Sequence, residues 1–211
     1  MIGCGRFGYS GEKTLYSLGH DVLAIDQDEE KIQSISDQVT HAVEADANDE
    51  NVLRSLGIRN FDVAVVSIGS DIQSSIMATL ICKELGVKYV LCKAKNELQA
   101  KVLYKIGADR VVFPERDMGI RVAHNLVSQN VLEYIELDPH YSIAEIVTPS
   151  KWIGKTIGEL DLRANYGINV MAVKHGMEIN ISPDALDTLK PGDILVVIGK
   201  NEQINKVEER G

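Results

Sequence analysis

A glycine-rich segment near the start of the sequence has the spacing of a phosphate-binding loop. Gly3, Gly5 and Gly8 form a GxGxxG pattern ahead of a predicted helix. In such a pattern the first glycine permits a tight turn, the second lets the backbone approach a pyrophosphate, and the third allows close packing of helix on strand. The helix N-terminus then presents free N–H groups and a partial positive charge. This segment therefore predicts a site for nucleotide phosphates.

Two aspartates are placed to hold the rest of a nucleotide. Asp26 ends a predicted strand 18 residues after Gly8. A carboxylate there accepts hydrogen bonds from an adenosine ribose and repels a 2′-phosphate, which disfavours NADP. Asp46 ends the next predicted strand and is a candidate for the adenine side. Each has an alternative role as a helix N-cap, Asp26 for a helix beginning near Asp28 and Asp46 for a helix from Asn48.

Further polar positions face the same predicted crevice, where open α/β sheets bind their ligands. Arg6 lies inside the glycine loop, and two interpretations stay open: a solvated surface residue, or a guanidinium that reaches a phosphate. A triphosphate would gain more from it than a dinucleotide pyrophosphate, because it carries more charge. Ser67, Ile68 and Gly69 follow one predicted strand and Lys93 ends another. The alternative for Lys93 is a solvated lysine.

The elements that must position these residues alternate between strand and helix from residue 1 to about residue 130. Continuous apolar runs, rather than strict alternation, indicate strands buried on both faces of a parallel sheet. We therefore predict an α/β domain with a Rossmann-like, doubly wound parallel sheet and right-handed crossovers. The predicted strands occupy residues 22–25, 42–43, 63–66, 89–91 and 111–113.

The glycine motif begins directly after Met1 and Ile2. A strand of about five apolar residues should precede such a motif. We therefore expect further residues upstream, with Met1 not the true start.

The remainder of the sequence predicts a second, smaller α+β module. Thr156 and Glu159 form a capping box at the start of a short helix over 156–162. A closing helix is predicted at 201–209. The predicted strands of this module occupy residues 141–147, 168–173, 178–182 and 193–199.

The expected organisation has three parts. A Rossmann nucleotide-binding domain occupies residues 1–117, a crossover or linker helix occupies 118–133, and a C-terminal regulatory domain occupies 134–211.

Composition excludes several classes of partner. The 211 residues carry 22 Lys and Arg against 31 Asp and Glu, a formal net charge of −9, and an acidic chain repels nucleic acid and anionic lipid. The apolar runs are far shorter than the roughly 20 residues of a membrane span. Cys4, Cys82 and Cys92 form no CxxC pair, which favours a reducing compartment over a disulfide framework. We expect a cytoplasmic protein that does not itself cross the membrane.

No pattern in the sequence indicates an enzyme. The five histidines are scattered, and two Tyr-x-x-x-Lys matches fail on context. Tyr9 and Lys13 lie at the start of the phosphate-binding helix, and Tyr89 and Lys93 lie ~13 Å apart along a predicted strand. A nucleotide fold without catalytic residues favours a sensor. An NAD-dependent oxidoreductase and a stand-alone nucleotide sensor stay open as alternatives.

Several segments together resemble a known family. They are the glycine motif at 3–8 with Asp26, and the stretches at 56–62, 105–109, 113–118 and 161–168. Over essentially its whole length the chain resembles the cytosolic regulatory subunits of bacterial Ktr-type potassium uptake systems. These are RCK proteins, regulators of potassium conductance, and are related to the Trk regulatory subunits.

The resemblance implies a place in a membrane complex. Such subunits form dimers that assemble into an octameric ring of identical chains, docked beneath a potassium-translocating integral membrane subunit at the inner face of the cell membrane. ATP or ADP in the N-terminal domain switches the ring and so the gate, and NAD(H) can occupy the same cleft. The helix over 117–130 would be the crossover that packs on a partner chain.

The resemblance also implies roles for individual residues. Arg6 would hold the γ-phosphate, Asp26 would hold the ribose, and Glu115 would help to bind Mg²⁺ or another cation near the nucleotide phosphates at the dimer interface. The alternative for Glu115 is an acid favoured by the dipole at a helix start. The residues expected to bind the nucleotide are Gly3, Gly5, Arg6, Phe7, Gly8, Asp26, Asp46, Ala47, Ser67, Ile68, Gly69, Lys93 and Glu115.

For the C-terminal domain, the resemblance implies binding of cyclic di-AMP across a two-fold interface. Arg163 would pair with a phosphate, Asn169 would read an adenine edge, and Ile157 and Ile168 would sandwich a base. Core packing is the alternative for the two isoleucines. The matching positions are Ile157, Asp161, Arg163, Ile168, Asn169 and His175.

Overall fold

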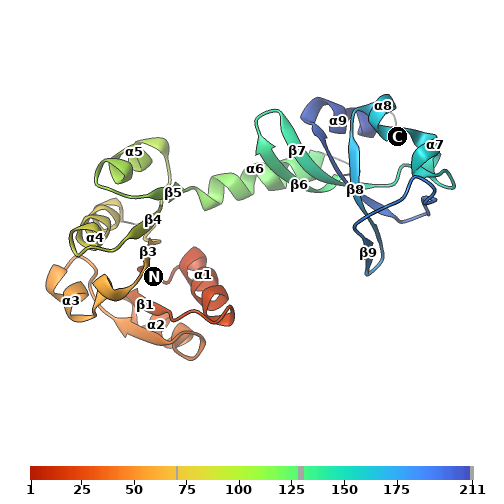
Figure 1. Ribbon diagram of the computed structural model, residues 1–211. Helices are drawn as coiled ribbons and strands as arrows, with labels where there is room; N and C mark the ends of the chain where they lie inside the picture. The colour runs from red at the N-terminus through yellow and green to blue at the C-terminus, as the bar shows by residue number, and fades with distance from the viewer. Residues whose placement is uncertain (70, 128–130, 210–211) are drawn as a thin grey trace. The chain divides into compact units, whose positions relative to one another are not determined.

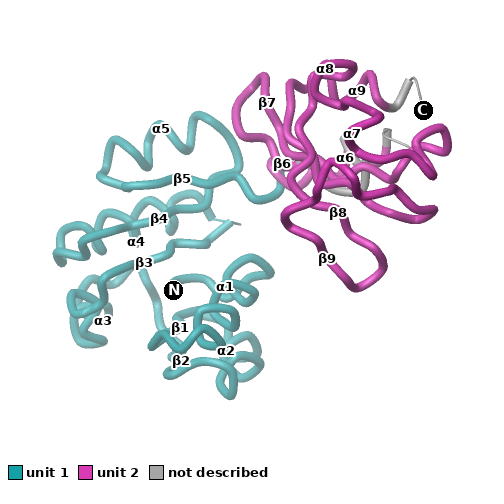
Figure 2. Tube along the Cα trace, turned by 45° about the vertical axis from the view of Figure 1, so that its right-hand side comes forward, with its two compact units in different colours: residues 1–116 teal, residues 117–211 magenta. Residues whose placement is uncertain are grey.

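The computed structural model describes residues 1–69, 71–127 and 131–209 (Figure 1). The chain divides into two compact units, Met1–Arg116 and Asp117–Gly211 (Figure 2). Each unit has a hydrophobic core of its own. Within the described part of the chain, no helix is long and apolar enough to span a membrane.

Unit 1 is built on a parallel sheet, which confirms the predicted doubly wound α/β fold. Its strands are β1 (Leu23–Asp26), β2 (His41–Glu44), β3 (Val63–Val66), β4 (Tyr89–Lys93) and β5 (Arg110–Val112). All the pairings among them are parallel. Ile2 forms parallel bridges with Ile25 and with Val66, so it stands between β1 and β3 in the order β2-β1-Ile2-β3-β4-β5.

Helices cover both faces of this sheet (Figure 1). They are α1 (Arg6–Ser17), α2 (Glu29–Ile35), α3 (Glu50–Ser55), α4 (Ile72–Glu84) and α5 (Glu97–Lys105). Along β1, Ala24 packs in a buried cluster with Ile32 and Ile35 of α2, whereas its neighbours Leu23 and Ile25 pack in a cluster that includes α3, α4 and α5. Successive residues of a strand point to opposite faces, so β1 is buried on both sides, as its continuous apolar run predicted.

α6 (Pro114–Val127) begins in unit 1 and continues into unit 2. The structure differs from the predicted linker helix at 118–133 at both ends. The helix starts earlier, at Pro114, whose fixed φ and missing N–H suit a first helical position. Residues 131–133 belong to strand β6 (Val131–Asp138), and residues 128–130 of the predicted helix lie outside the described residues. No glycine or proline follows Gly119 before Pro139, so the sequence carries no marker of the helix end.

Unit 2 is a five-stranded antiparallel sheet with helices, in agreement with the predicted α+β module. The sheet order is β6-β7-β10-β8-β9, where β7 is Tyr141–Val147, β8 Asn169–His175, β9 Glu178–Asn180 and β10 Ile194–Lys200. Ala144 and Ile146 of β7 and Leu195 and Val197 of β10 are buried in one core. Trp152 and the last helix, α9 (Asn201–Glu209), pack against the same core.

The capping box predicted at Thr156 is present. Thr156 Oγ1 accepts from the Glu159 N–H at 3.1 Å, and Glu159 Oε2 accepts from the Thr156 N–H at 2.8 Å. The predicted single helix over 156–162, however, is two short helices, α7 (Ile157–Leu160) and α8 (Leu162–Tyr166). Asp161 separates them because its φ of +38° is left-handed, a conformation that aspartate tolerates better than most residues.

All three cysteines are buried and free. Burial raises the pKa of the Cys82 thiol to about 12 and that of Cys92 to about 11, and it raises the pKa of Cys4 as well. Because the thiolate is the reactive form, we expect almost no labelling of the folded protein by iodoacetamide at about pH 8. Three thiols should react once urea unfolds the chain. Rapid labelling of the folded protein, followed by mass spectrometry, would contradict these buried positions.

Candidate functional site

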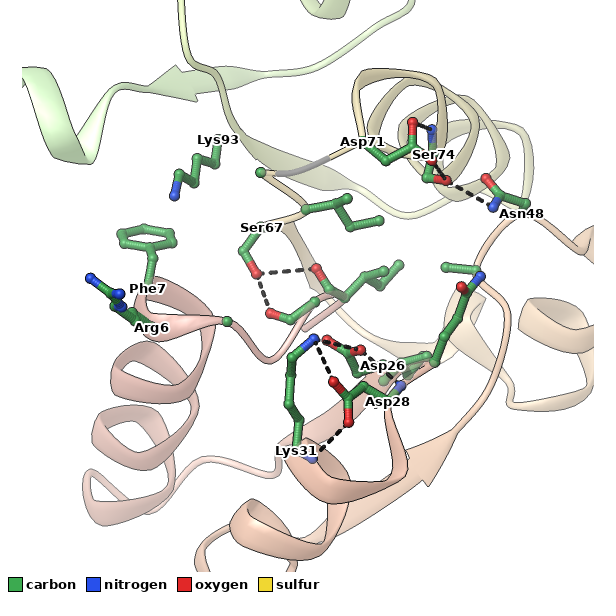
Figure 3. Close-up of a pocket in the computed structure, with 18 of the residues that line it drawn as sticks. Arg6, Phe7, Asp26, Asp28, Lys31, Asn48, Ser67, Asp71, Ser74 and Lys93 are labelled. Atoms are coloured by element: carbon green, nitrogen blue, oxygen red, sulfur yellow. Dashed lines mark hydrogen bonds and ion pairs between the residues drawn. The ribbon is translucent and has the colours of Figure 1, made fainter.

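A cleft of about 630 Å³ opens in unit 1. The strand order of the sheet reverses at Ile2, between β1 and β3, and open α/β sheets bind ligands outside the carboxyl ends of their strands at such a point. Figure 3 shows side chains from the start of α1, the end of β1 and the start of α4 around this cleft. The predicted residues that line it are Gly3, Gly5, Arg6, Phe7, Asp26, Ala47, Ser67, Ile68, Gly69, Lys93 and Glu115.

The N-terminus of α1 opens into the cleft without a side-chain cap. Its N-cap is Gly5, and no acid lies in its first turn. By contrast, Asp28 caps α2 and Asp71 caps α4, each accepting from two backbone N–H groups, and both of these acids line the same cleft. The free N–H groups and the positive dipole end of α1 are therefore what the cleft offers to an anion.

The three glycines of the motif meet three different geometric needs. Gly3 has a φ of +98°, which favours glycine strongly. A Cβ on Gly8 would lie 2.0 Å from the carbonyl oxygen of Gly3, so Gly8 lets α1 approach the loop and does not itself line the cleft. A Cβ on Gly5 would meet no atom within 4 Å. The space beside Gly5 is thus open to a ligand.

The Asp26 carboxylate is fixed at the end of β1 by backbone donors. Its Oδ2 accepts from the Cys4 N–H at 2.7 Å, and its Oδ1 accepts from the Asp28 N–H at 3.0 Å. The side chain is 13% exposed and lines the cleft. The alternative role of Asp26 as a helix N-cap is wrong, because Asp28 caps α2.

Asp46 does not line the cleft, unlike its neighbour Ala47. Its Oδ1 accepts from Gln27 Nε2 at 2.5 Å and from the Asn48 N–H at 2.8 Å. These bonds hold the carboxylate within the loop, so the structure does not place it on the adenine side of the cleft. Its alternative role as an N-cap is also wrong, because Asp49 caps α3.

Lys93 and Glu115 form an ion pair on another part of the cleft wall. Lys93 is only 12% exposed, so its alternative as a solvated lysine is wrong. Its hydrogen bond holds the pKa of the Glu115 carboxyl below the ordinary value. Ser67 completes this wall, since its hydroxyl donates to the carbonyl oxygen of Gly3 and lies 3.1 Å from that of Ile2.

In one chain, the described residues around Glu115 do not form a cation site made of protein ligands alone. The Glu115 carboxylate already pairs with Lys93. Among the residues that the structure describes, no three His, Cys, Asp or Glu side chains gather into a metal site built from protein ligands alone. Beside nucleotide phosphates, Mg²⁺ usually needs only one or two protein carboxylates, so the role of Glu115 as a cation ligand stays a prediction.

Arg6 stands exposed on the first turn of α1 and lines the cleft with Phe7 (Figure 3). The structure gives it no ion-pair partner among the described residues. Its guanidinium is therefore available to a ligand that lies on the α1 N-terminus. Contact with a phosphate stays a prediction.

Sequence reasoning missed several polar residues of the cleft. Asp28 and Asp71 could have been recognised as helix N-caps, since each stands directly before a helical pattern. Lys31 could not, because its place depends on how α2 turns its ammonium group back toward β1. The missed polar residues are Gln27, Asp28, Lys31, Asn48, Asp71, Ser74 and Lys95.

A fully buried carboxyl, Glu12 of α1, lies behind the glycine loop. Its Oε1 accepts from Cys4 Sγ at 3.3 Å, and its Oε2 has no hydrogen-bond partner among the described residues. Burial raises the pKa of Glu12, and the nearby charge of Asp26 adds to this rise. Cys4 thus contacts both acids, Glu12 through its thiol and Asp26 through its N–H.

Wild type should lose stability as pH rises because it buries the Glu12 carboxyl, and we expect Glu12→Gln to avoid this loss. The folded protein holds the Glu12 proton more tightly than the unfolded chain, so the free energy of unfolding falls as pH rises above the ordinary carboxyl pKa of 4.5. The stability of the variant relative to wild type should therefore grow with pH, by at most about 1.4 kcal/mol per pH unit. Urea unfolding from about pH 4 to about pH 8 measures this. A difference that stays constant with pH would contradict it.

In unit 2, the residues expected to bind cyclic di-AMP begin on the two short helices. Ile157 is half-buried at the start of α7, and Asp161 and Arg163 are exposed. Ile168 is 0% exposed and packs in the core of the unit. In this structure Ile168 is not accessible to a base, and it has the alternative role of core packing.

Asn169 and His175 lie at opposite ends of β8, which puts them ~20 Å apart. His175 Nδ1 lies 2.6 Å from Oδ1 of the buried Asp193, and both residues line a second cavity of about 350 Å³. None of the other five predicted positions lines that cavity. One chain therefore does not gather these six residues around a single space.

Two domain families match the chain. The TrkA-N domain matches residues 1–114, and the TrkA-C domain matches residues 142–210. The first match contains the glycine motif, Asp26 and the ion-paired Lys93. The second contains all six positions expected to bind cyclic di-AMP.

Named relatives match the chain over its full length. Ktr system potassium uptake protein C of Bacillus subtilis (strain 168) is 50% identical over 210 residues, which is 100% of this chain and 95% of that protein. Ktr system potassium uptake protein A of the same organism is 46% identical over 211 residues, again 100% of this chain and 95% of that protein.

A solved structure of a channel also matches. The GsuK channel bound to NAD is 27% identical, with a TM-score of 0.54, over 99% of this chain and 37% of that chain. The chain thus corresponds to part of that larger protein, and NAD binding is a property of GsuK.

Proposed function

Because the chain belongs to the KtrA/KtrC-like family of RCK proteins, we propose that it regulates a potassium-translocating membrane subunit in response to a bound nucleotide. The nucleotide occupies the cleft of unit 1. The protein works from the cytoplasm, at the inner face of the membrane, through the subunit that crosses it.

The uncapped N-terminus of α1 carries this proposal. It opens into the same cleft as the Asp26 carboxylate. Phosphate oxygens accept from the free N–H groups, and the ribose hydroxyls donate to Asp26. The α1 N-terminus suits the phosphates of an adenine nucleotide, and Asp26 suits its ribose. The local positive charge at the helix end allows a chain with a net charge of −9 to bind an anion.

ATP and ADP are the pair that the cleft would distinguish, with NAD(H) as an alternative occupant. Arg6 lines the cleft beside the α1 N-terminus without an ion pair of its own among the described residues. A third phosphate gives this guanidinium a partner that ADP lacks. A ligand shifts a conformational equilibrium only by its differential affinity for the two states, and the γ-phosphate is the group that supplies this difference.

The assembly and the second ligand belong to the same proposal. Copies of the chain form dimers and then an octameric ring, which couples the nucleotide to the gate. Cyclic di-AMP binds between two copies of unit 2, where Arg163 and Asn169 are exposed. The separation of Asn169 from His175 along β8 supports a site shared by two chains.

Binding rather than hydride transfer is the better use of this cleft. Its described lining includes no His side chain, the group that most often transfers protons in general acid–base catalysis. The lining therefore supports a sensor over an NAD-dependent oxidoreductase.

Calorimetry of the full chain with ATP, ADP and NADH tests the proposal, with GTP as the control. We expect saturable binding of the adenine nucleotides. An absence of binding by all three, or turnover of NADH with small carbonyl compounds, would overturn the proposed function.

A further inference from the structure

The ammonium group of Lys31 bridges two carboxylates at one end of the cleft (Figure 3). Its Nζ lies 3.3 Å from Asp26 Oδ1 and 3.3 Å from Asp28 Oδ2. Lys31 stands in the first turn of α2, three residues after the N-cap Asp28, and all three side chains line the cleft. A cation therefore already occupies the carboxylate that the proposed function assigns to the ribose.

The Asp26 carboxylate is close to saturated in this arrangement. The Cys4 N–H donates to Oδ2, whereas the Asp28 N–H and the Lys31 ammonium both donate to Oδ1. A carboxylate offers about four acceptor positions, so three are taken before a ligand enters. A ribose brings two adjacent hydroxyl donors, one more than the free capacity.

Only one of the three donors can withdraw without moving the backbone. The N–H groups of Cys4 and Asp28 are fixed by the glycine loop and by the turn into α2. Lys31, in contrast, has a flexible four-carbon side chain that is 44% exposed. Lys31 also keeps a second partner when it leaves Asp26, because its ammonium group already pairs with Asp28, whose side chain is 44% exposed.

We propose that Lys31 competes with the ribose hydroxyls for Asp26, and so sets how strongly the cleft selects ribonucleotides over 2′-deoxyribonucleotides. This inference rests on the proposed function. When the ribose docks, Lys31 leaves Oδ1 and stays paired with Asp28, so its charge remains compensated. Lys31 is a specificity-determining residue that acts through Asp26 rather than by touching the ligand.

The test compares the Kd values of ADP and 2′-deoxy-ADP, measured by calorimetry, in wild type, Lys31→Met and Lys31→Arg. Lys31→Met frees an acceptor for the 2′-hydroxyl, which only ADP can use. We expect the ratio of the 2′-deoxy-ADP Kd to the ADP Kd to rise about fivefold, the effect of one hydrogen bond. Lys31→Arg keeps a cation between the two acids and should keep the wild-type ratio.

Lys95→Met is the matched control for the loss of a positive charge. Lys95 also lines the cleft, but its charge acts on Glu115. Lys95→Met should weaken the binding of ADP and of 2′-deoxy-ADP by the same factor, so the ratio of their Kd values should stay unchanged.

The outcomes separate this inference from the function on which it rests. If wild type binds both nucleotides and Lys31→Met leaves the ratio unchanged or lowers it, competition by Lys31 is overturned while the proposed function stands. If wild type binds neither nucleotide, both are overturned. A ratio that rises in Lys31→Met, but not in Lys95→Met, supports the inference.

Discussion

Replacing Gly5 with alanine is expected to weaken nucleotide binding at least about a hundredfold while leaving unit 1 folded. The φ of −69° and ψ of −177° at Gly5 suit any residue, and the new Cβ would meet no protein atom within 4 Å. The methyl group would instead fill the space beside the α1 N-terminus where we place the phosphates. Calorimetry should show affinity for ATP and ADP lowered at least about a hundredfold, ~2.7 kcal/mol, with an unchanged urea midpoint.

Gly8→Ala is the contrasting variant. Its Cβ would lie 2.0 Å from the carbonyl oxygen of Gly3, so α1 must shift and the protein itself should lose stability. If Gly5→Ala retained wild-type affinity, the phosphates would not lie on the α1 N-terminus. If it lost stability as Gly8→Ala does, the open space beside Gly5 would be wrong.

Arg6→Ala is expected to weaken ATP binding much more than ADP binding. The guanidinium has no ion pair to lose among the described residues, so its removal should leave the fold intact. A charge-assisted hydrogen bond to the γ-phosphate is worth about 1.5–3 kcal/mol, so ATP should lose about tenfold or more. ADP, which lacks that phosphate, should lose little.

Arg59→Ala controls for the loss of one exposed arginine, since Arg59 lies outside the cleft. It should leave both affinities unchanged. Calorimetry with both nucleotides provides the comparison. Equal losses for ATP and ADP in Arg6→Ala would contradict the assignment of Arg6 to the γ-phosphate.

Local spacing predicted the parts of the site that depend on backbone geometry. The glycine motif, Asp26 and the strand ends at Ser67 and Lys93 were identifiable because a strand–turn–helix unit places them at one edge of the sheet. All but Gly8 and Asp46 of the thirteen predicted nucleotide-site residues line the cleft. Asp46 was predicted to face the nucleotide but does not line the cleft, because hydrogen bonds with Gln27 and Asn48 orient its carboxylate.

Features set by side-chain contacts between distant residues could not be predicted in this way. Lys31 lies on the cleft because α2 packs beside β1, and Lys93 is ion-paired because Glu115 contacts it from the start of α6. Ile168 has the apolar character of either a ligand contact or a core residue. Its full burial emerges from the packing of unit 2, which no spacing rule describes.

The same limit explains the errors in secondary structure. The break at Asp161 requires a left-handed backbone, and aspartate there carries only a weak signal for it, unlike glycine. β6 follows α6 without an intervening glycine or proline. The strand β6 is defined by its pairing with β7, which lies further along the chain. The sequence near the end of α6 alone therefore does not predict where β6 begins.

Potassium flux measured in vesicles tests the central claim most directly. The potassium-translocating partner would be reconstituted in the vesicle membrane with this chain bound to it. ATP or ADP would be added on the side of the membrane where this chain is bound. We predict that flux differs between the two nucleotides and that Gly5→Ala abolishes the difference. Equal flux with ATP and ADP, in a complex that binds both nucleotides, would contradict the account.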